Sequence, residues 1–144
     1  MKSAVQVSCK SLLTVLAHTM TKQSEKTYSE PEIAARLSEE LPHWTYENGW
    51  IRRKFRTSGW KSTLMVVNTV GHLAEAAWHH PDLSISYAFV IVKLATHSAK
   101  GITDKDFALA RKIEEVIQWH AREDSGGIFE GTPDDPRFKY LKYD

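Results

Sequence analysis

Three histidines are the residues of this sequence best suited to carry chemistry. His79 and His80 stand side by side before Pro81, and His97 follows Thr96 further along the chain. Histidine is the side chain that titrates near neutral pH without help from its surroundings, so a group of histidines can accept and donate protons in one turnover. The pattern indicates acid/base catalysis, provided that the fold brings the three rings together.

The same histidines leave other readings open. Zinc would compete for them, but adjacent histidines point apart, no His-Glu-x-x-His spacing occurs, and Cys9 is the single cysteine of the chain. A serine hydrolase would need a Gly-x-Ser-x-Gly turn, which the sequence lacks. The histidine pair before Pro81 could also be a plain polar turn. Likewise, Glu75 could be a helix-surface partner of His79, and Asp106 is first of all a helix-capping residue.

The elements on either side of the histidines show how they would be positioned. Residues 60–77 read as a helix with two apolar sides, which ends near Trp78 because Pro81 disfavours helical geometry before it. Residues 83–96 are rich in β-branched and aromatic side chains and predict one or two strands. The histidine pair therefore follows a helix end and the third histidine a strand end, and such ends meet at the rim of a two-layer domain.

The remaining signals complete an α+β pattern. A capping box over 29–32 opens a helix that Pro42 ends, and a second box opens a helix over 103–121. Between them, the turn at 48–49 joins two strands of a hairpin. The order helix, strand, strand, helix, strand, strand, helix favours an antiparallel sheet with helices on one face, a two-layer α+β domain. A parallel Rossmann arrangement is disfavoured, because no Gly-rich strand-to-helix turn is present.

The return strand of the hairpin, over 50–56, contains one residue that breaks its pattern. Ile51 and Phe55 share an apolar face, and Arg53 lies between them on that face. The other face carries the cations Arg52, Lys54 and Arg56. A solvated strand face explains these three cations, and contact with phosphates is the alternative.

Length and composition limit the organisation of the chain. Its 144 residues, 42% hydrophobic and 26% charged, are typical of one globular domain. With 19 Lys and Arg against 18 Asp and Glu, bulk electrostatic binding to nucleic acid or to an anionic membrane is not expected. We expect a domain over 28–122, a poorly ordered extension over 1–27 in which Met20 is an alternative start, and a turn-rich tail over 123–144. We expect a cytoplasmic protein without a membrane span.

A series of spaced motifs resembles the signature of the pterin-4a-carbinolamine dehydratases. The series consists of Glu75-x-x-x-His79-His80-Pro81, Tyr87, Thr96-His97 and Gly101-Ile102-Thr103-x-x-Asp106. The similarity extends from about Ser29 to Ile117. It implies a four-stranded antiparallel sheet with three helices on one face. It also implies a hydro-lyase that converts 4a-hydroxytetrahydropterin to quinonoid dihydropterin and water during tetrahydrobiopterin recycling, without metal or other cofactor.

The resemblance places the active-site histidines of that family on His79, His80 and His97. Hydroxide is a poor leaving group, so the 4a-oxygen needs a proton, and the N5 hydrogen must also leave. We expect His79 and His97 to be the proton-transfer pair and His80 mainly to hold the pterin.

Three further residues match family positions. Glu75 and Asp106 match positions at the edge of the site, where they would orient histidines or bind the ring. Trp44 matches a tryptophan near the pocket, where an indole would cover the flat pterin, with a place in the hairpin core as the alternative.

One departure and two alternatives accompany the resemblance. Family members often have Asp or Asn where this chain has Trp78, so a different pterin, related to the molybdenum cofactor, is an alternative substrate. Some animal relatives also act as dimerization cofactors of a homeodomain transcription factor, which makes a non-catalytic role the second alternative. The expected partners are the pterin and further copies of the chain, as a homodimer or homotetramer with helix 60–77 at the interface.

Overall fold

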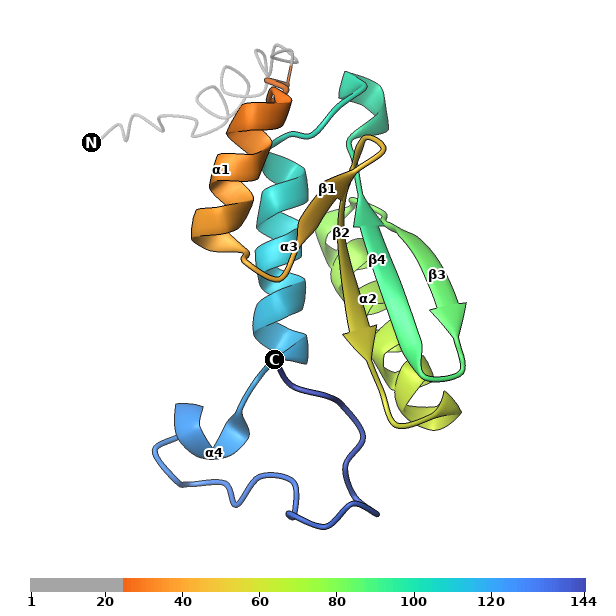
Figure 1. Ribbon diagram of the computed structural model, residues 1–144, viewed down its shortest axis with the longest axis vertical. Coiled ribbons are helices and arrows are strands. Elements are labelled where there is room, and N and C mark those ends of the chain that lie inside the picture. Colours follow the sequence, from red (N-terminus) through yellow and green to blue (C-terminus); the bar gives the residue numbers. More distant parts are fainter. Residues whose placement is uncertain (1–24) are drawn as a thin grey trace, which may run out of the picture.

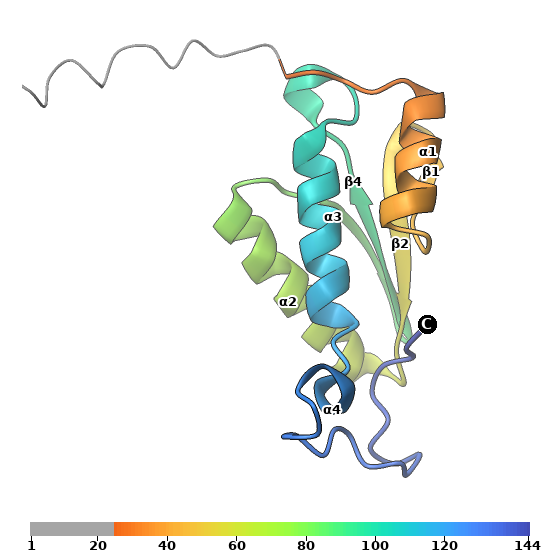
Figure 2. The ribbon, with the colours of Figure 1, turned by 90° about the vertical axis from the view of Figure 1, so that its left-hand side faces the viewer.

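A computed structural model describes residues 25–144, which build one antiparallel sheet with helices on one of its faces (Figures 1 and 2). The strands lie in the order β1 (Thr45–Glu47), β2 (Trp50–Arg56), β4 (Phe89–Leu94) and β3 (Asp82–Ser86). Every neighbouring pair is antiparallel. The α+β class and the four-stranded antiparallel sheet expected from the sequence are confirmed.

Three long helices cover the sheet, and two short ones lie at its ends. The long helices are α1 (Glu30–Glu40), α2 (Trp60–Ala77) and α3 (Asp104–Ile117), and the short ones are η1 (His97–Ala99) and α4 (Ala121–Asp124). Figure 2 shows α2 and α3 to the left of the strands, on one side of the sheet, and α1 over β1. Within the described part of the chain, no helix has the length and apolar character needed to cross a membrane.

Local signals explain where most of these elements begin and end. Both capping boxes form: Ser29 pairs with Glu32 at the start of α1, and Thr103 pairs with Asp106 at the start of α3. Helix α2 has the bounds that its sequence pattern predicted. Residues 83–96 contain two strands rather than one, because the chain turns at 87–88.

The end of α3 differs from the sequence expectation. The helix stops at Ile117 instead of about Ala121, and the backbone N–H of Gln118 caps it on the carbonyl of Glu114. Val116 is 40% exposed and His120 is exposed, although helical spacing from the buried Ile113 and Ile117 would place both on the apolar side. Helical spacing predicts which residues share a face, but not where the layer beneath that face ends.

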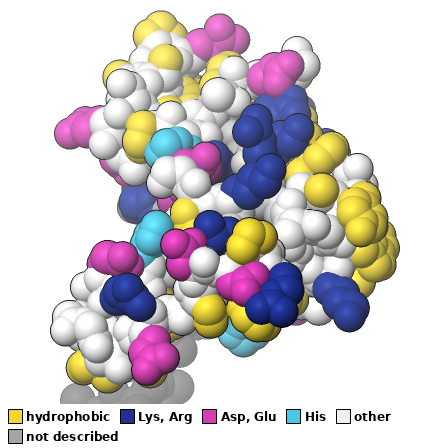
Figure 3. All heavy atoms as spheres, turned by 60° about the horizontal axis from the view of Figure 1, so that its bottom comes forward, with side chains coloured by type: hydrophobic (Ala, Val, Ile, Leu, Met, Phe, Trp, Pro, Cys, Tyr) yellow, Lys and Arg dark blue, Asp and Glu magenta, His cyan; other side chains and the backbone are white. Residues whose placement is uncertain are grey.

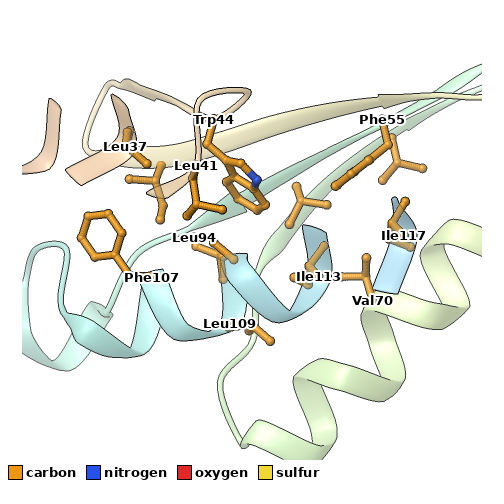
Figure 4. Packing of buried hydrophobic residues seen from close by; sticks show 14 of the residues in the cluster. Leu37, Leu41, Trp44, Phe55, Val70, Leu94, Phe107, Leu109, Ile113 and Ile117 are labelled. Atoms are coloured by element: carbon orange, nitrogen blue, oxygen red, sulfur yellow. The ribbon is translucent and has the colours of Figure 1, made fainter. Parts of the chain in front are cut away.

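The hydrophobic core lies between the sheet and the helices (Figure 4). Strands β2 and β4 form its floor, and their inward side chains are almost completely buried. Its largest contributions come from Ile51, Phe55, Val90, Val92 and Leu94 of the sheet, and from Ile33, Leu37, Val70, Phe107 and Ile113 of the helices. The core fixes the relative positions of α2, α3 and β4, whose ends carry the predicted site residues.

Arg53, the charged residue on the apolar face of β2, is buried and forms ion pairs with two carboxylates. It is 7% exposed, and its Nε lies 3.3 Å from Oε2 of Glu114 on α3. It also pairs with the side chain of Asp144 at the end of the described chain. The same Oε2 of Glu114 accepts a hydrogen bond from Nε1 of Trp44 at 2.8 Å. A buried cation is tolerated here because its charge and its donors are matched.

The tail beyond α3 folds back onto the domain. Leu141 is 7% exposed and forms an antiparallel bridge with Thr57 at the end of β2. The N–H of Lys142 donates to the carbonyl of Arg56 at 3.0 Å, and the N–H of Ser58 donates to the carbonyl of Tyr140 at 3.1 Å. Strand β1 pairs only with residues 50–52, and the tail bonds further along, to residues 56–58. Figure 3 shows apolar side chains exposed among charged ones at this end of the molecule.

Candidate active site

The end of α2 places the histidine pair. Trp78 caps the helix with φ 50° and ψ 41°, in the left-handed region, and its N–H bonds to the carbonyls of Ala74 and Glu75. The N–H of His79 bonds to the carbonyl of Ala74 at 3.1 Å. The chain therefore turns sharply before β3 begins. Glycine, asparagine and aspartate adopt this backbone conformation most readily, so a tryptophan in it is unusual.

His79 lies against the first turn of α3. Its Nε2 is 2.7 Å from Oδ1 of Asp106, which is 0% exposed, and the His79 side chain is 13% exposed. Asp106 holds two more hydrogen bonds through Oδ2, from the hydroxyl of Thr96 at 2.7 Å and from the N–H of Thr103 at 2.8 Å. Asp106 is therefore buried behind His79 and in hydrogen-bond contact with it, where it can orient the imidazole.

His80 and His97 are more exposed than His79. Nε2 of His80 is 2.9 Å from Oε1 of Glu75, one turn back on α2, and its ring meets Trp78 edge-to-face at a centroid distance of 5.4 Å. His97 begins η1, directly after β4 and Thr96. The ring of His97 meets Trp50 of the hairpin edge-to-face, also at 5.4 Å.

The three histidines line one pocket. Its volume is about 260 Å³, and its walls are Trp78, His79, His80, Ala95, Thr96, His97, Ser98 and Lys105. The pocket thus gathers the end of α2, the end of β4 and the start of α3. His79 and Lys105 also border an apolar groove of about 490 Å³ between α2 and α3. Several groups able to transfer protons therefore face a common space, as general acid/base catalysis requires.

The structure does not bring every expected site residue to this pocket. Glu75 reaches the site through His80, and Asp106 reaches it through His79. Trp44 is 3% exposed and packs edge-to-face on Phe55 in the core (Figure 4). It does not line the histidine pocket, so its indole has the hairpin-core place that the sequence left as the alternative.

Sequence reasoning missed other neighbours of the histidines. Trp50 packs on His97, Lys105 lines the pocket, and the Thr96 hydroxyl donates to the buried Asp106. The one available signal was that Thr96 directly precedes His97. Across residues 25–144, no group of three or more His, Cys, Asp and Glu side chains is arranged to hold a metal ion.

Comparison with known proteins gives a consistent family. The chain is 47% identical over 90 residues to a putative pterin-4-alpha-carbinolamine dehydratase of Aquifex aeolicus, covering 62% of this chain and 90% of that protein. A protein of the same description from Chloroflexus aurantiacus is 47% identical over 89 residues, covering 62% and 95%.

A solved structure agrees with these relatives. The transcriptional coactivator/pterin dehydratase from Brucella melitensis superposes with a TM-score of 0.58 at 28% identity, over 63% of this chain and 98% of that one. Residues 26–116 match the family described as pterin 4 alpha carbinolamine dehydratase. This match spans the sheet, nearly all of the three long helices and every residue of the pocket, and the chain therefore belongs to the pterin-4a-carbinolamine dehydratase family.

Proposed function

We propose that this protein dehydrates 4a-hydroxytetrahydropterin to quinonoid dihydropterin and water by histidine acid/base catalysis, as a step of tetrahydropterin recycling. The observation that carries the proposal is the pocket in which His79, His80 and His97 meet. Family membership supports the substrate class, and the pocket supports the type of reaction.

The residues of the pocket can supply the two proton transfers that this dehydration requires. One imidazolium protonates the 4a-oxygen, which leaves as water. A neutral imidazole takes the proton from N5, and the electron pair left on N5 forms the new double bond. One proton is given and one is taken, so no electrons pass to the protein. Each such proton transfer contributes on the order of 10²–10⁴-fold to the rate. His79 and His97 are assigned to these steps.

His80 is assigned to holding the pterin. Its ring is half exposed, and Glu75 fixes its Nε2 from the solvent side. Because Nε2 is occupied, Nδ1 of the ring remains for the ligand. Glu75 thus acts on the pterin through His80.

The test is the rate of carbinolamine dehydration, followed by the absorbance of the product. Wild type should accelerate the reaction, and His79→Ala and His97→Ala should each lose about 10²-fold or more of that acceleration. His72→Ala, which removes an exposed histidine of α2 outside the pocket, serves as the control and should retain full activity. Equal rates for all four proteins would overturn the catalytic assignment.

Assembly into a homodimer or homotetramer is proposed through α2. On this helix, Trp60, Leu64 and Met65 are between 38% and 54% exposed, whereas Val66 and Val70 face the core. Exposed apolar side chains of this size are typical of an interface between subunits. In sedimentation, wild type should be a dimer or tetramer. Met65→Glu should be a smaller species.

A different pterin, related to the molybdenum cofactor, is a second candidate substrate. Trp78 favours this candidate, because its indole lines the pocket where family members often have a short polar side chain. Relative rates on two pterin carbinolamines, measured for wild type and Trp78→Asn, decide the point. A changed preference supports an altered substrate, and an unchanged preference favours the ordinary one.

A non-catalytic role as a dimerization cofactor is the remaining candidate. The description of the Brucella melitensis protein includes transcriptional coactivator. Partner binding of this kind should survive His79→Ala, which removes the acid/base chemistry.

A further inference from the structure

We infer that a buried pair of hydroxyls, Thr103 and Thr96, fixes Asp106 and through it one tautomer of His79, so that Nδ1 is the atom offered to the substrate. The inference deepens the proposed function and rests on it for the identity of the substrate. Neither threonine is assigned a direct part in the reaction; both are positioning residues.

The hydrogen bonds of Asp106 leave one oxygen for the histidine. Oδ2 accepts from the Thr96 hydroxyl at 2.7 Å and from the Thr103 N–H at 2.8 Å. Oδ1 lies 2.7 Å from Nε2 of His79. The carboxyl group is 0% exposed, so these protein donors, and not solvent, set its state. Two donated hydrogen bonds and a position in the first turn of α3 favour the ionised carboxylate.

The direction of the hydroxyl pair follows from counting hydrogens. A threonine hydroxyl has one hydrogen to donate, and Thr96 gives its hydrogen to Asp106. In the 2.8 Å contact between the two hydroxyls, Thr103 must therefore be the donor. Oγ1 of Thr103 in turn accepts the N–H of Lys105 at 3.3 Å. The chain of donors runs one way, from the backbone of α3 to the carboxylate.

An ionised Asp106 determines which nitrogen of His79 carries the proton. A carboxylate only accepts, so Nε2 must donate, and in the neutral ring the lone pair is then on Nδ1. Within residues 25–144, Nδ1 has no hydrogen-bond partner and is not fully buried. A buried anchor behind Nε2 and an Nδ1 that is not fully buried suit a general base that takes the N5 proton.

The experiment combines nitrogen NMR of the His79 ring with kinetics. When the His79 ring of wild type is neutral, Nε2 should show the chemical shift of a protonated nitrogen and Nδ1 that of an unprotonated one. Thr96→Val keeps the shape but removes the hydroxyl; it should give a mixture of tautomers and lower kcat on the order of tenfold. Thr96→Ser restores the hydroxyl and should restore both readouts.

A matched control comes from a second buried threonine. Thr63 is 0% exposed and also shares its hydroxyl with a threonine, Thr57, at 2.7 Å, far from the pocket. Thr63→Val removes a similar buried hydroxyl and should leave the His79 tautomer and kcat unchanged. A change of equal size in both valine variants would mean a general loss of packing and would overturn the positioning role.

The outcomes separate this inference from the proposed function, because the NMR readout needs no substrate. An unprotonated Nε2 in wild type overturns the inference even if Thr96→Val does not fold, and even if the enzyme is active. Suppose that Nε2 is protonated in wild type and that Thr96→Val gives a mixture of tautomers, but that the protein does not dehydrate the carbinolamine. The NMR result then supports the positioning role, and the missing activity overturns the proposed function.

Discussion

At the scale of single residues, Trp78 combines an unfavourable backbone with a place in the pocket wall. Its φ of 50° puts a bulky side chain in the left-handed region, and the indole is 79% exposed. Few contacts of the side chain offset the backbone cost, which is about 1–2 kcal/mol for residues other than glycine, asparagine and aspartate. Strain that persists at the wall of a pocket is typical of functional positions.

Replacement of Trp78 by asparagine should therefore stabilise the protein. We expect Trp78→Asn to raise the free energy of unfolding by about 1 kcal/mol, measured by urea denaturation, because asparagine accepts this conformation at low cost. Trp119→Asn is the control, since Trp119 is 50% exposed and has no positive φ. A less stable Trp78→Asn would show that the indole contributes packing that outweighs the strain.

At the scale of elements, Arg36 joins α1 to the start of α3. Its Nε donates to Glu40 at 2.9 Å and its Nη1 to Asp104 at 2.8 Å, while the guanidinium lies 3.9 Å from the ring centroid of Phe107. Hydrogen bonds from Arg36 lower the pKa of Glu40 below its usual 4.5 and the pKa of Asp104 below its usual 3.8. The N-terminus of α3, which carries Asp106, is thus held partly from α1.

The lowered pKa values predict a dependence of stability on pH. A carboxyl group whose folded pKa is depressed adds stability above its unfolded pKa and loses it as the pH falls through the folded pKa. Wild type should therefore exceed Arg36→Gln in stability at neutral pH, and the difference should shrink as the pH falls below about 4. Thermal unfolding from pH ~7 to pH ~2.5 measures the difference.

The control for this series is Lys61→Gln. Lys61 is exposed and joins no ion pair within residues 25–144, so its variant should follow wild type at every pH. A constant gap between wild type and Arg36→Gln would mean that Arg36 acts by covering Phe107 and not by its charge.

At the scale of the whole molecule, residues 118–144 are part of the packed domain although they lie beyond the family match at 26–116. They supply Leu141 to the core, backbone hydrogen bonds at the end of β2, and Asp144 to the buried Arg53. The tail therefore closes the end of the molecule away from η1 and the start of α3, as Figure 1 shows, and so away from the elements that line the histidine pocket.

Loss of the Leu141 contact should destabilise the protein without harming the pocket. We expect Leu141→Ala to lower the free energy of unfolding by about 2–3 kcal/mol, since a mostly buried leucine is truncated. Ile128→Ala, at 81% exposure in the same tail, should cost less. Calorimetry measures both, and the proposed dehydratase activity at ~20 °C, well below unfolding, should be unaffected. No difference between the two variants would mean that the tail does not hold its docked position in solution.

Much of the fold could be read from local signals. The capping boxes at Ser29 and Thr103, the turn before Trp50 and the proline after His80 each act within a few residues, so they mark element ends without reference to the rest of the chain. The histidines of the candidate site could also be predicted from the sequence. They directly follow the predicted ends of a helix and a strand, and they belong to the series of spaced motifs. The expectation for 1–27 concerns mostly residues outside 25–144.

Only the tertiary structure decided which distant groups meet. His79 reaches Asp106 across 27 positions, Trp44 reaches Glu114 across 70, and Arg53 reaches Asp144 across 91. These pairings placed Trp44 in the core, Asp106 beneath its histidine and the tail against β2. Periodicity and capping report the preferences of neighbouring residues, whereas the partner of a buried polar group is chosen by the packing of all layers together.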